Sequence, residues 1–266
     1  MDFKKITEVL VTAKAVQYVM IAVLLIGAFF LPRLAVKQET EAARQEATAE
    51  VQQLKDSQQS GGNEQAANGT IVLDPGHGGD DPGMIGAGGI NEKKLNLIYA
   101  KKLQALLEAE GYRVVLTRET EEGLYDVDAA HKKAQDMQRR VAIIAEEAPL
   151  ITVSIHQNSY QDPAVSGPQV FYYENSAEGQ KLAKSIQDSM NSELSEARSR
   201  VEKSNSSYYI LKRSQGTTVI VECGFLSNPE EEARLQEEAY QDRVCAAVCK
   251  GILQYLDEDS DESKIS

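Results

Sequence analysis

Two histidines and one glutamate stand where apolar segments of the sequence end. His77 comes shortly after the segment IVLD, His156 directly follows LITVSI, and Glu222 directly follows TTVIV. The chain contains only three histidines, so two of the three occupy such positions. Because open α/β sheets bind their ligands outside the carboxyl ends of the strands, we expect these side chains to meet at one edge of a sheet.

Histidine and carboxylate side chains are the ligands that catalytic zinc uses. Such a site holds Zn²⁺ through three side chains and keeps a position for water, whose pKa the metal lowers to about 7. A further carboxylate near the metal then serves as general base. Glu92 opens a predicted helix, so it is either a ligand or a residue that complements the helix dipole. Glu222 is either the base or a paired structural carboxylate, and burial of that charge is costly without a role or a partner.

The other motifs of the chain favour no competing active site. The glycine-rich loop at residues 74–89 lacks the GK[ST] of a P-loop and the spacing of a dinucleotide-binding fingerprint. No GxSxG elbow and no CxxC pair are present, which disfavours a serine nucleophile and a thiolate zinc site. We expect Cys223, Cys245 and Cys249 to be buried thiols, and His131, on a charged helix, to be exposed to solvent.

Charge and composition exclude some classes of partner. The chain has 266 residues and a formal net charge of −13. Phosphate binding needs clustered lysine and arginine, so this charge argues against a nucleic-acid partner. Tryptophan is absent, so any glycan contact must use tyrosine, phenylalanine or polar groups.

The N-terminal region predicts a membrane anchor followed by a spacer. Residues 15–31 are nearly all apolar, which is about the minimum length for crossing a bilayer. A cleavable signal peptide has a shorter apolar stretch and small residues at its end, whereas this one ends in Phe29, Phe30 and Leu31. We therefore predict the following organisation: a short tail (1–14), a transmembrane anchor (15–31), a helical stalk and flexible linker (32–69), a catalytic domain (70–256) and an acidic disordered tail (257–266).

Apolar runs alternate with amphipathic segments through the predicted domain. This alternation is typical of an α/β fold with a twisted mixed, largely parallel sheet flanked by helices on both faces. The predicted strands are 71–74, 112–117, 150–155, 169–173 and 217–221, with a short edge strand at 207–212. The predicted helices are 92–110, 128–147, 176–194 and 240–256.

Several segments, taken in order, resemble a known family. IVLDPGHGGDDPG, followed by NEKKLNL and RVVLTR, resembles the opening of the zinc-dependent N-acetylmuramoyl-L-alanine amidases of the amidase-3 type. SIHQNS resembles their SIHxN motif, and VIVECGFLSNPEE resembles their closing segment. The resemblance covers roughly residues 70–256. It implies one zinc ion per chain held by His77, Glu92 and His156, with Glu222 as catalytic base.

The same resemblance implies an activity and leaves alternatives. The expected reaction is hydrolysis of the amide between the lactyl group of N-acetylmuramic acid and L-alanine in peptidoglycan. The segment KKAQDMQRR looks more like the amidases of spore-cortex maturation than those of division. Asp74, Arg118 and Asn158 are candidates for supporting roles around the metal. The alternatives are a non-catalytic peptidoglycan-binding or scaffold protein, and a zinc peptidase or deacetylase acting on another wall amide.

The expected location follows from the substrate. Lysines and arginines lie on both sides of the apolar run, so the positive-inside rule hardly decides its orientation. Peptidoglycan lies outside the membrane, so we expect a single-pass protein of the cytoplasmic membrane with its catalytic domain outside the cytoplasm. The expected partners are peptidoglycan, the membrane through the N-terminal helix, and an activator or targeting protein of unknown identity.

Overall fold

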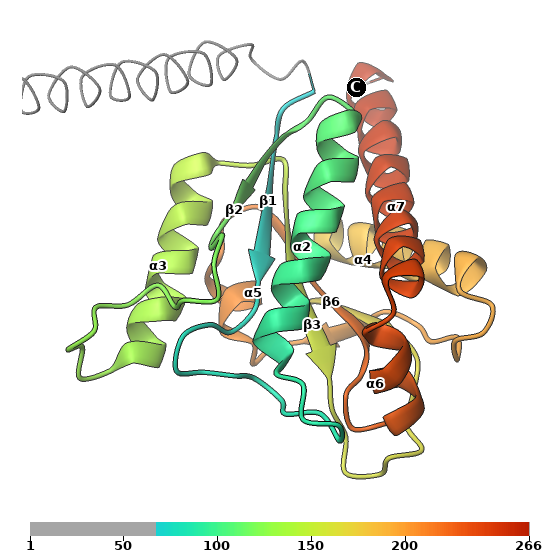
Figure 1. The fold of residues 1–266 in the computed structure, drawn as a ribbon. Helices are drawn as coiled ribbons and strands as arrows, with labels where there is room; N and C mark the ends of the chain where they lie inside the picture. The colour runs from blue at the N-terminus through green and yellow to red at the C-terminus, as the bar shows by residue number, and fades with distance from the viewer. Residues whose placement is uncertain (1–67, 266) are drawn as a thin grey trace, which may run out of the picture. The chain divides into compact units, whose positions relative to one another are not determined.

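A six-stranded sheet in the order β2-β1-β3-β6-β4-β5 is the framework of the domain. The computed structural model describes residues 68–265 (Figure 1). Every pairing is parallel except that of β4 with β6, which confirms the predicted mixed, largely parallel sheet. The strands are β1 (Thr70–Pro75), β2 (Arg113–Leu116), β3 (Ile151–Asn158), β4 (Gln169–Tyr173), β5 (Lys203–Asn205) and β6 (Thr217–Phe225).

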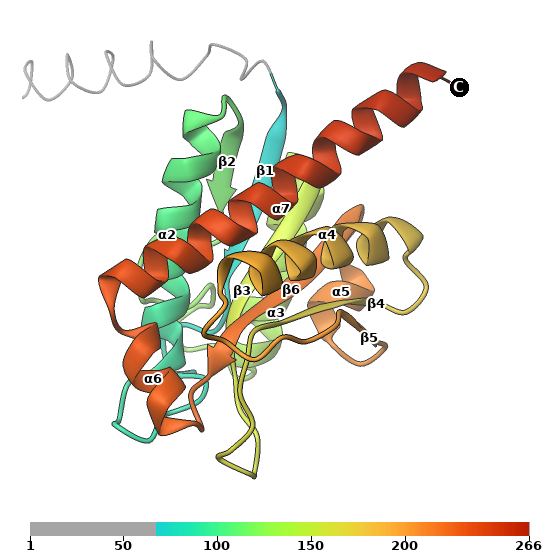
Figure 2. The same ribbon diagram turned by 90° about the vertical axis from the view of Figure 1, so that its right-hand side faces the viewer.

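Helices cover both faces of this sheet, as Figure 2 shows. One face packs against α2 (Glu92–Ala109), α4 (Ala177–Glu193) and α7 (Glu238–Ile265), and these elements form the larger hydrophobic core. The other face packs against α3 (Lys132–Glu147) and α5 (Tyr209–Arg213) around a smaller core. The short helix α6 (Pro229–Leu235) follows β6.

The alternation of side chains along the strands decides which face carries the polar residues. Ile71 and Leu73 of β1 belong to the larger core, whereas Val72 belongs to the smaller one. Side chains of a strand point to opposite faces in turn, so Asp74 shares the face of Val72. The same alternation along β3 and β6 places His156 and Glu222 on this α3-facing side. The polar residues therefore gather at the carboxyl end of the sheet, beside the smaller core.

One predicted strand is a helix. Residues 207–212 were expected to form an edge strand, but the chain forms α5 there, and the edge strand is β5. Asn205 explains the change, because its side-chain oxygen accepts hydrogen bonds from the backbone N–H groups of Ser207 and Tyr208. Such side-chain bonds turn the chain out of an extended conformation.

Two other predicted boundaries also differ. The helix expected from residue 128 begins at Lys132, because the chain before it forms a loop tied to α3 through hydrogen bonds to Gln135 and Asp136. The acidic tail expected to be disordered from residue 257 instead continues α7 to Ile265. Adding residues to a helix that is already packed costs far less than starting one, so like charges do not stop it.

The predicted membrane anchor lies outside the described residues, as do the predicted tail, stalk and most of the linker. Among the helices described between residues 68 and 265, none is long and apolar enough to cross a membrane. The anchor therefore stays a prediction from the sequence.

Candidate metal centre

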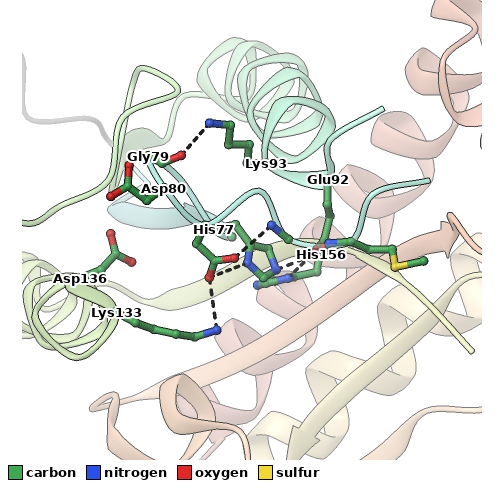
Figure 3. A network of polar contacts seen from close by, with 12 residues as sticks. His77, Gly79, Asp80, Glu92, Lys93, Lys133, Asp136 and His156 are labelled. Atoms are coloured by element: carbon green, nitrogen blue, oxygen red, sulfur yellow. Dashed lines mark hydrogen bonds and ion pairs between the residues drawn. The ribbon is translucent and has the colours of Figure 1, made fainter. Parts of the chain in front are cut away.

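The predicted site residues come together at the carboxyl ends of the central parallel strands. His77 lies in the loop after β1, and Glu92 is the first residue of α2. His156 of β3 stands directly beside Glu222 of β6 in the sheet register. Figure 3 shows Glu92, His77 and His156 close together at this edge of the sheet. The sequence had placed His156 and Glu222 just after their strands, but both strands extend through them.

Glu92 is the hub of this cluster. Its Oε2 lies 3.2 Å from His77 Nε2, and its Oε1 lies 2.9 Å from His156 Nδ1. The backbone N–H groups of Met84 and Gln157 also donate to its carboxylate, at 2.8 Å and 3.1 Å. Burial raises the pKa of Glu92, but the hydrogen bonds from the histidines outweigh it and hold the pKa well below its usual range. Glu92 is therefore a carboxylate at neutral pH.

The three side chains form a donor set suited to a metal ion. One ligand atom from each of His77, Glu92 and His156 lies within 4.8 Å of the others. The histidine rings meet edge to face, with centroids 4.9 Å apart. Two imidazoles with one carboxylate are typical of catalytic zinc. A cleft of about 410 Å³ opens beside both histidines and gives access from solvent.

Glu222 lies in a different environment from Glu92. Its side chain is buried, and its Oε2 has no hydrogen-bond partner within the part of the chain that the structure describes. Burial raises the pKa of Glu222 to about 7, with His156 opposing the shift and Glu92 adding to it. A carboxyl with a pKa near neutrality can both accept and release a proton at physiological pH.

The loop that carries His77 has no room for larger side chains. A β-carbon at Gly76 would lie 2.1 Å from His156 Nε2, so the backbone passes against the ring. His77 itself has φ of 61°, in the left-handed region that non-glycine residues seldom occupy. Such strain persists only where the surroundings hold it, and it is concentrated at functional sites.

A buried ion-pair network stabilises the loop that carries His77. Arg140 of α3 is 1% exposed and donates to Asp74 Oδ1 at 2.6 Å and to Asp136 Oδ2 at 2.5 Å. It also donates to the carbonyl oxygens of Pro75 and His77. Burial raises the pKa of Asp74, but Arg140 and two hydroxyl donors reverse the shift and bring it to about 2. Asp74 therefore supports the site indirectly. It holds Arg140 in place, and Arg140 in turn binds the loop that carries His77.

The other two residues predicted to support the metal behave differently from each other. Arg118 is buried, and its guanidinium donates to the carbonyl oxygens of Pro75 and Gly76, at 2.9 Å and 2.8 Å. Burial lowers the pKa of Arg118 to about 10. Asn158 instead accepts a hydrogen bond from the N–H of Ser159, and no polar contact links it to the cluster in the described structure.

Sequence reasoning missed residues that support the site. Arg140 was noted as part of KKAQDMQRR, but not as a buried residue. The signal was present, because Asp136, Arg140 and Ile144 recur every four residues and form the buried face of α3. Asp81, which lies 3.1 Å from His77 Nδ1, was also missed because the loop is too irregular for a periodicity to indicate contacts. The three cysteines are buried and unpaired and His131 is exposed, as expected.

Comparison with known proteins gives consistent matches. Residues 71–254 match the family model described as N-acetylmuramoyl-L-alanine amidase. The chain is 37% identical over 194 residues to the germination-specific N-acetylmuramoyl-L-alanine amidase of Bacillus subtilis strain 168, covering 72% of this chain and 81% of that protein. It is 31% identical over 189 residues to the amidase LytC of the same strain, covering 70% of this chain but 35% of that longer protein.

Solved structures show the same fold. The CwlD amidase of Clostridioides difficile, solved in complex with the GerS lipoprotein, matches with a TM-score of 0.69 and 35% identity. That match covers 71% of this chain and 99% of the CwlD chain. The amidase AmiC2 of Nostoc punctiforme matches with a TM-score of 0.63 and 32% identity, over 72% of this chain and 99% of its own.

The ion-pair network predicts a large difference between two adjacent arginines. Arg140→Met should lower the free energy of unfolding by about 3–5 kcal/mol, because it leaves the carboxylates of Asp74 and Asp136 buried without their cation. Arg139→Met removes an exposed pair with Asp126 and should cost no more than about 1 kcal/mol. Urea unfolding of both variants measures the difference. Equal destabilisation would contradict the structural role given to Arg140.

The environment of Glu222 predicts a stability that depends on pH. Its folded-state pKa, about 7, lies above the usual value of 4.5, so the stability it contributes is present below pH 4.5 and is lost as pH rises from 4.5 through 7. In metal-free protein, the free energy of unfolding of Glu222→Gln relative to the parent should therefore increase by on the order of 3 kcal/mol from pH 5 to pH 8. Thermal unfolding in chelator at the two pH values measures this. A difference that does not change with pH would show that Glu222 is not held protonated.

Proposed function

The chain belongs to the N-acetylmuramoyl-L-alanine amidase family, and we propose that it hydrolyses its peptidoglycan substrate with one zinc ion held by His77, Glu92 and His156. The bond cleaved is the amide between the lactyl group of N-acetylmuramic acid and L-alanine. The observation that carries the proposal is the unpaired Oε2 of Glu222, buried beside a His-Glu-His cluster that opens to a cleft.

The metal and its ligands have separate tasks. A zinc ion held by His77, Glu92 and His156 would polarise the scissile carbonyl and lower the pKa of water. His77 and His156 supply neutral nitrogen donors, and Glu92 supplies one negative charge. The backbone and side-chain donors around Glu92 hold its carboxylate in one orientation, so little reorganisation is needed during the reaction.

Glu222 acts as the proton carrier. It takes a proton from the attacking water and later returns it to the nitrogen of the departing alanine. A pKa near neutrality suits both transfers, because the group must be a base first and an acid afterwards. A bound dication would favour the carboxylate form and oppose the effect of burial, so that Glu222 would be charged before it takes the proton from water.

Glu222 also separates this proposal from a non-catalytic wall-binding protein. Binding peptidoglycan needs no buried, unpaired carboxyl, and burying one costs free energy unless it has a use. A peptidase or deacetylase acting on another wall amide would use the same arrangement of groups. The substrate that is cleaved, and not the geometry of the site, distinguishes that alternative from the amidase proposal.

We further propose a role in spore-cortex maturation, where removal of the peptide leads to muramic lactam. Two observations support it. The segment KKAQDMQRR resembles that subfamily, and the Bacillus subtilis relative at 37% identity is named germination-specific.

A location at the outer face of the cytoplasmic membrane is proposed as well. The apolar residues 15–31 support an anchor, and the substrate requires the domain to lie outside the cytoplasm. The CwlD amidase, similar over most of the described domain, was solved with a lipoprotein. We propose a membrane-bound lipoprotein as the activator or targeting partner of this chain.

The amidase proposal predicts one zinc per chain and a strong dependence on Glu222. The parent protein, given purified peptidoglycan, should release intact stem peptides with new L-alanine amino termini, detected by mass spectrometry. Glu222→Gln should keep its zinc, because it is not a ligand, but lose about 10²–10⁴-fold in rate. His156→Ala should lose both metal and activity.

Each failure has its own meaning. A Glu222→Gln protein that cleaves at the parent rate would remove Glu222 from the mechanism. Zinc binding with cleavage of a different wall amide would favour the peptidase or deacetylase alternative. A folded parent that binds no zinc and releases no peptide would favour the wall-binding alternative.

The membrane proposal predicts exposure of the domain on the cell surface. Protease added to intact protoplasts should remove residues 70–256, and deletion of residues 15–31 should release the protein from the membrane fraction. A cytoplasmic protein serves as the control for lysis. Complete protection of the domain in intact protoplasts would contradict the proposed orientation.

A further inference from the structure

We propose that Asp81 is a positioning residue that sets the tautomer of His77 and so prepares that histidine to bind the metal. The inference rests on the metal-binding part of the function proposed above. Asp81 Oδ2 lies 3.1 Å from His77 Nδ1, on the side of the ring away from Glu92.

The placement of Asp81 is built into the loop. The backbones of Gly78 and Asp81 exchange hydrogen bonds in both directions, at 3.0 Å and 3.1 Å, and close a tight turn after His77. The N–H of Gly83 donates to Asp81 Oδ1 at 3.1 Å, which leaves Oδ2 for the histidine. Both oxygens of this carboxylate therefore have defined partners within the loop.

The chemical consequence follows from the two nitrogens of imidazole. A carboxylate only accepts hydrogen bonds, so Asp81 requires the proton of neutral His77 to be on Nδ1. Glu92, 3.2 Å from Nε2, attracts a proton to that nitrogen in the metal-free protein. Asp81 opposes this tautomer, because with the proton held on Nδ1 the lone pair of Nε2 is available to a metal ion. A carboxylate that accepts a hydrogen bond from a metal-binding histidine also makes the imidazole a stronger electron-pair donor to the metal.

The second histidine of the cluster is held differently. His156 turns Nδ1 toward Glu92, and its Nε2 lies against the backbone of Gly76. No carboxylate contact to its Nε2 is present among residues 68–265. His77 therefore depends on a side-chain partner for its tautomer, and Asp81 is that partner.

Lys133 also approaches Asp81, with Nζ 3.2 Å from Oδ2. Its side chain is 78% exposed, so solvent screens the pair and its contribution is small. Lys133 therefore weakens the interaction between the carboxylate and His77 only slightly.

Replacing Asp81 by asparagine tests the tautomer directly. If the amide oxygen stays on the N–H of Gly83, the amide NH₂ group faces His77 Nδ1. Two donors cannot pair, so the histidine moves its proton to Nε2, where it opposes metal binding. If the amide turns over, the hydrogen bond from Gly83 is lost instead. Either arrangement weakens the site without removing a ligand.

The first measurement is zinc affinity of the full protein by competition with a chelator. Asp81→Asn should bind zinc about 10–100-fold more weakly than the parent. Asp80→Asn is the matched control, because Asp80 is the adjacent acid, is mostly exposed and pairs with Lys132. It should change the affinity less than twofold, as should Lys133→Met. Equal weakening by Asp80→Asn would overturn the proposal, because it would show a general effect of charge.

The second measurement is the tautomer itself, from ¹⁵N shifts of the histidine rings in zinc-free protein at pH 8. The chain has three histidines, so the signals can be assigned by single substitutions. In Asp81→Asn, His77 should lose the proton from Nδ1 and keep one on Nε2, which faces Glu92, while His131 and His156 stay unchanged. An unchanged tautomer with unchanged zinc affinity would overturn the inference.

A second pair of variants guards against a folding defect. If Asp81→Asn does not fold, Asp81→Glu and Asp81→Gln are compared at equal side-chain length. The glutamate should keep more zinc affinity than the glutamine, and equal affinities would overturn the proposal. None of these measurements uses peptidoglycan, so a protein that binds zinc as described but cleaves no amide would refute the amidase proposal alone.

Discussion

The site depends on the ion pairs and hydrogen bonds that the buried guanidinium of Arg140 makes. It neutralises Asp74 at the end of β1 and Asp136 on α3, and it donates to the carbonyl oxygens of Pro75 and His77. Without it, the negative charges of Asp74 and Asp136 would be buried without their cation, which costs more than the pairing itself gains. The arginine therefore joins the sheet, α3 and the metal-binding loop into one unit.

Within that unit, two carboxylates a short distance apart have opposite properties. Glu92 receives hydrogen bonds from both histidines and from backbone donors, and its pKa lies well below its usual range. Glu222 has an oxygen with no donor, and burial raises its pKa to about 7. When two acids differ in pKa in this way, the one with the low pKa stays charged and the one with the raised pKa can transfer protons. The fold produces this difference by placing Glu92 at a helix start and Glu222 on a buried strand.

The sequence allowed the site to be located but not its supporting network. Parallel strands end at one edge, so apolar runs followed by His77, His156 and Glu222 were enough to predict that these residues meet. Segments with weak periodicity were predicted less well. The side chain of Asn205 turns residues 207–212 into a helix, which no apolar pattern indicates. Asp81 was missed for a related reason, because its contact with His77 depends on the turn of a glycine-rich loop.

The ligands also differ in how firmly the fold holds them. His156 lies on a central strand and Glu92 at the start of a long helix, so both are fixed by the core. His77 lies in a loop and has a strained backbone, with φ of 61°. The costly features of the domain gather around it: the buried Arg140, the Arg118 contacts to the carbonyl oxygens before it, and the carboxylate of Asp81. Because a metal ion binds only when all its ligands are in place, the free energy that orders this loop contributes directly to metal affinity.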